Sequence, residues 1–267
     1  MATAGNDSEK RTYRSVAEMW SEELADESGR ASWYAKATEH WESQEATING
    51  VLGGYPETNG PDLRESKRFL DMIIRQPSSP RFGLALDAGA GIGRVTKGLL
   101  AQCFQRVDLV EPCMKLLEVA RKELEDAPVE RFISSSLQAF EPEPGRYDVI
   151  WAQWVLLYLP DDDLVRFLQR CKVGLRHKGL ICVKENVVLN GSWHIDREDN
   201  SIMRTDAQYR AIFKRAGLTV WQELRQTCWP KDLFPVMMYA LRPAASSMKR
   251  PASSRAGVVS AIGVPRH

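Results

Sequence analysis

The residues best suited to chemistry lie in the glycine-rich segment 89–93, which reads G-A-G-I-G. It follows a short apolar segment at 84–87 and precedes a predicted helix over 94–103. Glycines let the backbone turn sharply and approach a ligand closely, and a helix N-terminus offers free N–H groups. Glu111 ends the next predicted strand, where a carboxylate can accept hydrogen bonds from both hydroxyls of a ribose. The pattern predicts a nucleoside cofactor; a tight turn without a ligand is the alternative.

Two charged side chains beside this turn indicate which nucleoside it holds. A dinucleotide site would have the spacing G-x-G-x-x-G and would bind a pyrophosphate at the helix N-terminus. Here the spacing is G-x-G-x-G and Asp87 precedes it. A carboxylate there would repel a diphosphate but could orient the ammonium of a methionine moiety. Arg94 could pair with the methionine carboxylate. The residues therefore favour S-adenosyl-L-methionine as the cofactor.

Polar residues beyond the next two predicted strands extend this site. In open α/β sheets, ligands lie beyond the carboxyl ends of the strands. Residues 136–138 follow the third predicted strand, where they would cover an adenine, and Gln153 and Trp154 follow the fourth. As an alternative, Gln138 and Gln153 would only cap loop backbone.

The elements that must position these residues form an alternating series. Apolar segments with the character of strands alternate with helical segments, at 82–87, 107–111, 131–135, 147–152, 179–185, 218–224 and 235–241. Such alternation predicts a mainly parallel sheet covered by helices on both faces. The last two strands have only a short link and should form an antiparallel hairpin. The expected fold is α/β, a class I methyltransferase (Rossmann-like), doubly wound seven-stranded sheet with an antiparallel terminal hairpin and an N-terminal helical extension.

Helices and domain limits follow from periodicity, caps and breakers. Predicted helices cover 31–47, 62–75, a segment capped by Asp161, and 205–216 with Gly217 as its C′ residue. Three glycines predict a loop over 49–55. We expect a flexible N-terminal segment at 1–30, with helical turns near 15–24. The methyltransferase domain should cover 31–242, with a helix and substrate loop in 31–60. A disordered basic tail should cover 243–267.

Composition limits the classes of partner. The 36 basic and 35 acidic side chains nearly cancel, so no global charge draws the chain to nucleic acid or membranes. Five cysteines without CxxC spacing suit a reducing compartment and argue against a disulfide framework or zinc cluster. The longest apolar stretch, 149–159, is too short to span a bilayer. We expect a soluble protein of the cytoplasm, the nucleus or both, without nucleic-acid or membrane partners.

Several segments together resemble the α-N-terminal protein methyltransferases, which methylate the exposed amine of proteins that begin X-Pro-Lys or X-Pro-Arg. The similarity spans roughly residues 33–242. Its most specific parts are L-G-G-Y at 52–55 and I-W-A-Q-W at 150–154. The remaining matching segments are 86–94, 137–138, 142–144, 147–155, 184–186 and 196–201.

This resemblance implies roles for the cofactor-binding and catalytic residues. The implied cofactor-binding residues are Gly89, Gly91, Arg94, Glu111, Pro112, Leu137, Gln138 and Gln153. Asp199 would lie beside the amine, Asn186 would hydrogen-bond the peptide backbone, and Tyr158 stands where the family often has histidine. A neutral tyrosine is a poor base near pH 7, which places proton removal on Asp199 or water. An α-amino group has a pKa of about 8, so one acceptor suffices.

The resemblance also implies a groove for a peptide N-terminus. Trp154 would flank the substrate proline, and Leu52 and Gly53 would line the entry groove. Asp196 and Ser201 would receive the basic third residue, as carboxylates suit Lys or Arg.

Three departures from the family pattern qualify this groove. Arg197 follows Asp196 where the family has adjacent carboxylates, one extra residue lies between positions 186 and 199, and Phe234 stands where the family can have tyrosine. Without the family match, Asp199 could simply cap a following helix. The rival functions are a small-molecule methyltransferase on the same fold and a non-catalytic cofactor-binding partner.

Overall fold

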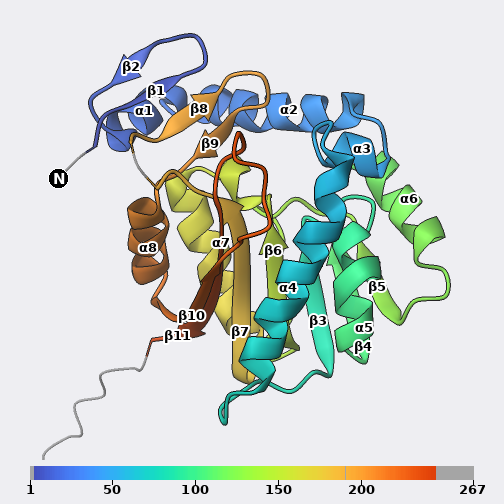
Figure 1. The fold of residues 1–267 in the computed structure, drawn as a ribbon. Helices are drawn as coiled ribbons and strands as arrows, with labels where there is room; N and C mark the ends of the chain where they lie inside the picture. Colours follow the sequence, from blue (N-terminus) through green and yellow to red (C-terminus); the bar gives the residue numbers. More distant parts are fainter. Residues whose placement is uncertain (1–2, 190, 245–267) are drawn as a thin grey trace, which may run out of the picture.

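The computed structural model describes residues 3–189 and 191–244, and its centre is a seven-stranded sheet (Figure 1). The strands lie in the order β10-β11-β7-β6-β3-β4-β5. Their bounds are β3 (Leu84–Ala88), β4 (Arg106–Val110), β5 (Val129–Ile133), β6 (Tyr147–Gln153), β7 (Leu175–Asn186), β10 (Leu218–Arg225) and β11 (Val236–Pro243). β11 pairs antiparallel with both β10 and β7, while the pairs among β7, β6, β3, β4 and β5 are parallel. All seven predicted strands and the terminal hairpin are confirmed.

Helices cover both faces of this sheet, as the doubly wound prediction requires. One core packs α7 (Asp161–Gly174) and α8 (Asp206–Arg215) against the sheet. The other core packs α4 (Asn59–Ile74), the π-helical turn η2 (Thr96–Leu100) with α5 (Ala101–Cys103), and the end of α6 (Met114–Glu123). β3 and β6 are buried along their whole length, because each is central and covered on both sides. Within the described residues, no helix combines the length and apolar character needed to cross a bilayer.

Helix ends mostly follow the predicted signals. Thr205 begins α8 with a capping box, and Gly217 follows its end with φ +72°. The prediction that Asp161 caps α7 is wrong, because Pro160 occupies the cap position and Asp161 is the first helical residue. Asp161 instead accepts two hydrogen bonds from Arg204, at 3.0 and 2.8 Å.

The N-terminal segment differs most from expectation, because it is folded rather than flexible. β1 (Gly5–Asp7), β2 (Thr12–Tyr13), β8 (His194–Asp196) and β9 (Ser201–Met203) form a second sheet in the order β2-β1-β8-β9. α1 (Val16–Glu23) and α2 (Glu27–Ser43) follow, and this layer crosses the top of the main sheet (Figure 1). Tyr13, Met19 and Trp33 are buried there with residues of β8 and β9. A segment too polar to fold alone is ordered by apolar partners distant in sequence.

The predicted loop and tail are also corrected in part. Part of the predicted loop 49–55 is the short helix α3 (Ile48–Val51), which Thr47 caps by accepting a 3.1 Å hydrogen bond from Gly50 N. The turn that follows leads into η1 (Pro56–Thr58). Pro243 still belongs to β11, and the predicted tail from residue 245 onward lies outside the described residues.

Candidate active site

A pocket opens at the carboxyl edge of β3, β4 and β6 and is closed above by α2. It brings together all eight residues that the sequence assigned to the cofactor, namely Gly89, Gly91, Arg94, Glu111, Pro112, Leu137, Gln138 and Gln153. Trp154 and Tyr158 line the same pocket, and Tyr34 and Trp41 of α2 complete it. Elements far apart in sequence therefore meet where the fold places ligands.

The glycine turn forms the floor of this pocket. The N–H groups of Gly89 and Ala90 both donate to the carbonyl of Val110, at 2.9 and 3.1 Å. Gly89 has φ +77°, and a Cβ there would lie 2.5 Å from Val155. Gly91 has φ +56°, and a Cβ there would have only Val51 nearby, at 4.0 Å. The turn thus needs glycine for its conformation, and at Gly91 the missing side chain leaves space for a ligand.

Two buried carboxyl groups near the glycine turn have different hydrogen-bond partners. Glu111 accepts from the N–H groups of Gly91 and Cys113, both at 2.9 Å, and burial raises its pKa. Each Glu111 oxygen keeps a lone pair for a ribose hydroxyl. Asp87 instead faces inward and accepts a 2.6 Å hydrogen bond from the Thr96 hydroxyl, and burial raises its pKa to about 6. Asp87 does not line the pocket, and its role in orienting the methionine ammonium, directly or through water, stays a prediction.

A buried carboxylate that the sequence did not indicate, Asp62 of α4, connects several site residues. Arg94 donates to Asp62 Oδ2 at 2.7 Å, and Gln153 Nε2 lies 2.9 and 3.0 Å from its two oxygens. Lys184 Nζ lies 2.5 Å from Oδ1. Burial alone would raise the pKa of Asp62, but Lys184 and Arg94 outweigh it and hold that pKa below its usual value. Asp62 therefore fixes the side chains of Arg94 and Gln153, both of which line the pocket.

Of the predicted catalytic residues, Tyr158 lines the pocket and contacts Asp199, which lies behind it. Tyr158 ends η3 (Leu156–Tyr158), and its hydroxyl donates to Asp199 Oδ2 at 3.0 Å. Burial, together with the charge of Asp199, raises the pKa of Tyr158 well above its usual value. The N–H of Ser201 donates to Asp199 Oδ1 at 2.9 Å. The alternative in which Asp199 caps a helix is wrong, because the strand β9 follows it.

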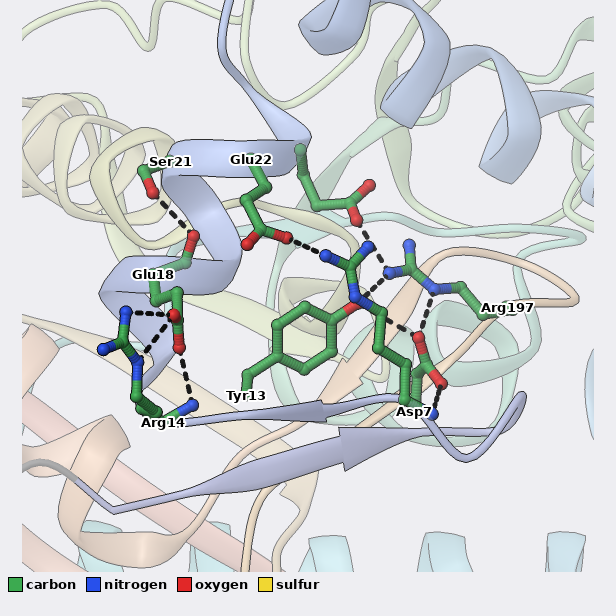
Figure 2. Close-up of polar contacts among 9 residues, drawn as sticks. Asp7, Tyr13, Arg14, Glu18, Ser21, Glu22 and Arg197 are labelled. Atoms are coloured by element: carbon green, nitrogen blue, oxygen red, sulfur yellow. Dashed lines mark hydrogen bonds and ion pairs between the residues drawn. The ribbon is translucent and has the colours of Figure 1, made fainter.

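Arg197, a departure from the family pattern, is neutralised by the N-terminal segment (Figure 2). Its Nε lies 3.1 Å from Asp7 Oδ2, and its Nη2 lies 2.7 Å from Glu23 Oε1 and 2.6 Å from the Tyr13 hydroxyl. Two carboxylates therefore surround one guanidinium. These two ion pairs balance the charge of Arg197, which directly follows Asp196 in the sequence.

The remaining predicted residues lie around the pocket rather than in its wall. Asp196 is exposed at the β8–β9 turn and pairs across the hairpin with Ser201. Leu52 and Gly53 follow α3, but it is Val51 that lines the pocket. Asn186 ends β7, and its Oδ1 is buried without a partner among the described residues.

Further residues that sequence reasoning left without a role come from α2. Trp41 packs edge-on against Tyr158 with ring centroids 6.1 Å apart, and Trp33 Nε1 donates to the carbonyl of Tyr158 at 2.9 Å. Trp33, Ala37 and Trp41 recur every four residues and therefore share one face of α2. That face packs over η3, the turn that ends at Tyr158.

Comparisons with known proteins agree with this geometry. A family model described as AdoMet dependent proline di-methyltransferase matches residues 29–242. The alpha N-terminal protein methyltransferase 1 of Arabidopsis thaliana is 41% identical, with 90% of this chain and 91% of that protein covered. The N-terminal Xaa-Pro-Lys N-methyltransferase 1-B of Xenopus laevis is 44% identical over 79% of this chain and 95% of its own. A solved SAM-dependent methyltransferase from Leishmania major superposes with a TM-score of 0.85 at 39% identity, covering 91% and 97% of the two chains.

Proposed function

This chain belongs to the family of AdoMet dependent proline di-methyltransferases, and we propose that it methylates the α-amino group of protein N-termini that begin X-Pro-Lys or X-Pro-Arg. It is an S-adenosylmethionine-dependent enzyme with a class I methyltransferase fold. The observation that carries the proposal is the hydrogen bond to the Asp199 carboxylate from Tyr158, a residue that lines the pocket built on the glycine turn. We propose that Asp199 accepts the amine proton at this end of the pocket.

The pocket fits S-adenosylmethionine. Space beside Gly91 admits a nucleoside close to the backbone, and Glu111 holds acceptor oxygens at the ribose position. Leu137 and Gln138 would cover the adenine, and Arg94 and Gln153 would face the methionine part. When bound, the cofactor supplies a methyl group on a sulfonium. The protein's contribution is to hold the amine nitrogen in line with that methyl.

Asp199 and Tyr158 would prepare the amine for methyl transfer. Asp199 is the acceptor for its proton, while Tyr158, whose pKa is raised, keeps its own proton and fixes one Asp199 oxygen. Trp154 would flank the substrate proline, Asn186 would bind the peptide backbone, and Leu52 and Gly53 would line the entry. For the basic third residue we propose Asp196 and Ser201. Binding of a cation there is supported by the pairing of Arg197 with Asp7 and Glu23.

We further propose that the chain acts in the cytoplasm, the nucleus or both. All five cysteines are free, and Cys228 is exposed, which suits a reducing compartment. Protein N-termini are its proposed partners.

A transfer assay tests the proposed function. The full chain is incubated with methyl-labelled cofactor and an X-Pro-Lys peptide, with X-Ala-Lys and X-Pro-Gln peptides as controls. We expect label on the X-Pro-Lys peptide in preference to both controls. No transfer to any peptide would contradict the proposal and favour a small-molecule substrate.

A further inference from the structure

Gln226, directly after β10, is a buried side chain with no assigned role. It is 4% exposed, and neither its Nε2 nor its Oε1 has a hydrogen-bond partner among the described residues. A buried polar atom without a hydrogen-bond partner destabilises the folded state, and this amide has two such atoms. Native structures rarely keep such groups without a reason, and a ligand that pairs with them is one such reason.

Strand register places Gln226 on the same face of the sheet as Asn186. The N–H of Gln226 donates to the carbonyl of Val236 at 3.0 Å, which continues the β10–β11 ladder by one pair. Val236 in turn pairs with Asn186 of β7. Residues paired directly across strands point to the same face. With strands about 4.8 Å apart, the Cα atoms of Asn186 and Gln226 lie roughly 10 Å apart along the sheet edge.

This face is the one covered by α4. Lys184, two residues before Asn186, donates to the Ser66 hydroxyl of α4 at 2.8 Å, and Thr227 donates to Glu65 of α4 at 3.2 Å. β10 runs parallel to β7, because β11 pairs antiparallel with both. Gln226 therefore lies at the carboxyl edge of the sheet, the same edge at which the pocket opens.

Other unpartnered polar atoms lie at this edge. Asn186 Oδ1 and Trp154 Nε1 are also buried without partners among the described residues. Trp154 lines the pocket and packs against Trp229 of the β10–β11 loop, with ring centroids 5.7 Å apart. Trp229 Nε1 donates to the carbonyl of Phe234 at 3.0 Å. Polar atoms without hydrogen-bond partners therefore lie just beyond β6, at the end of β7 and just beyond β10. Along the sheet, these strand ends are successively farther from the pocket.

We propose that Gln226 is a further substrate-binding residue, whose amide pairs with the main chain of the N-terminal peptide; this inference rests on the proposed function. An amide offers both a donor and an acceptor, which match the C=O and N–H of a peptide unit. Proline has no N–H, so the first main-chain N–H of an X-Pro-Lys terminus belongs to its third residue. Gln226 Oε1 accepts from that N–H or from a later one. Because Gln226 is buried, this pairing requires the β10–β11 loop to move and admit the peptide.

The test substitutes Gln226→Leu, an apolar side chain of similar size, and measures peptide KM, kcat, cofactor Kd and Tm of the full chain. We expect the peptide KM to rise about tenfold, because two hydrogen bonds to the substrate are lost. kcat and cofactor Kd should stay within about twofold, and Tm should be equal or higher because an unpaired buried amide is removed. Gln222→Leu, the same change in β10, should leave all four unchanged.

An unchanged peptide KM in a folded Gln226→Leu enzyme would overturn the inference and leave Gln226 as a merely buried amide. If that variant does not fold, Gln226→Met provides the same comparison. Failure of the proposed function can be distinguished from this result, because the unmodified chain would then methylate no peptide.

Discussion

At the scale of single residues, Asp199 and Tyr158 have different proposed roles in removing the proton of the amine. Asp199 has one oxygen held by the N–H of Ser201 and the other by the Tyr158 hydroxyl. Because burial and the Asp199 charge raise the pKa of Tyr158, the phenol stays protonated at neutral pH. We therefore propose that the carboxylate is the base and that the phenol fixes its position.

Asp199→Asn should therefore lower kcat by about 100-fold or more, while cofactor Kd changes less than about twofold. Tyr158→Phe is the matched comparison and should lower kcat less than about tenfold, since it removes only one hydrogen bond. Steady-state kinetics and calorimetry measure both. Equal losses of turnover and cofactor affinity in Asp199→Asn would show a structural role instead.

Glu111 is the residue on which cofactor affinity should depend most. Glu111→Ala removes the acceptor for Gly91 N–H as well as the proposed ribose contact, so the cofactor Kd should rise at least about tenfold. Glu118→Ala, an exposed change on α6, should leave it unaffected. Calorimetric titration measures the cofactor Kd of both variants. An unchanged cofactor Kd in Glu111→Ala would show that Glu111 does not bind the ribose.

Glu185 makes folding stability depend on pH. It is fully buried, its Oε1 accepts from the N–H groups of Val155 and Leu156, and burial raises its pKa from 4.5 to about 8. A carboxyl with a raised folded pKa contributes its full stability below 4.5, and that contribution is lost as pH rises to about 8.

Glu185→Gln keeps an acceptor oxygen but cannot ionise. Its free energy of unfolding should therefore exceed that of the unmodified chain at pH 8, while the gap closes towards pH 5. Chemical denaturation at both pH values measures this gap, with the exposed Glu39→Gln as control. A gap independent of pH would contradict the account.

At the scale of elements, the N-terminal strands and α1 hold the loop that carries the proposed third-residue site. β1 pairs with β8, and Asp7 and Glu23 hold the Arg197 guanidinium. The N-terminal layer is thus positioned to affect specificity as well as stability.

Replacing both carboxylates, by Asp7→Asn with Glu23→Gln, frees the charge of Arg197 beside Asp196. The preference for X-Pro-Lys over X-Pro-Gln peptides, measured as the ratio of kcat/KM values, should fall roughly fivefold, or about 1 kcal/mol. Glu22→Gln, which disrupts the exposed pair with Arg11, should not alter the ratio. An unaltered ratio in the double variant would show that Arg197 does not influence the third residue.

At the scale of the whole molecule, sequence alone predicted the main sheet and most of the pocket. The seven strands were visible because each is a local apolar run between turn residues, and strand ends then placed Glu111 and Gln153 at one edge. The β1–β8 pairing was not visible, because it depends on contacts between segments far apart in sequence. The role of Asp62 was not visible either, because its partners Arg94, Gln153 and Lys184 are distant in sequence. In the sequence, Asp62 is only an acidic residue in the first turn of a helix.

The central claim is that this fold delivers a protein's α-amine to the methyl donor. Tandem mass spectrometry of an X-Pro-Lys peptide after reaction locates the added methyl directly. The account predicts methyl groups on the N-terminal nitrogen, none on the lysine side chain, and no reaction with the N-acetylated peptide. Methylation of the lysine side chain, or equal reaction of the acetylated peptide, would contradict it.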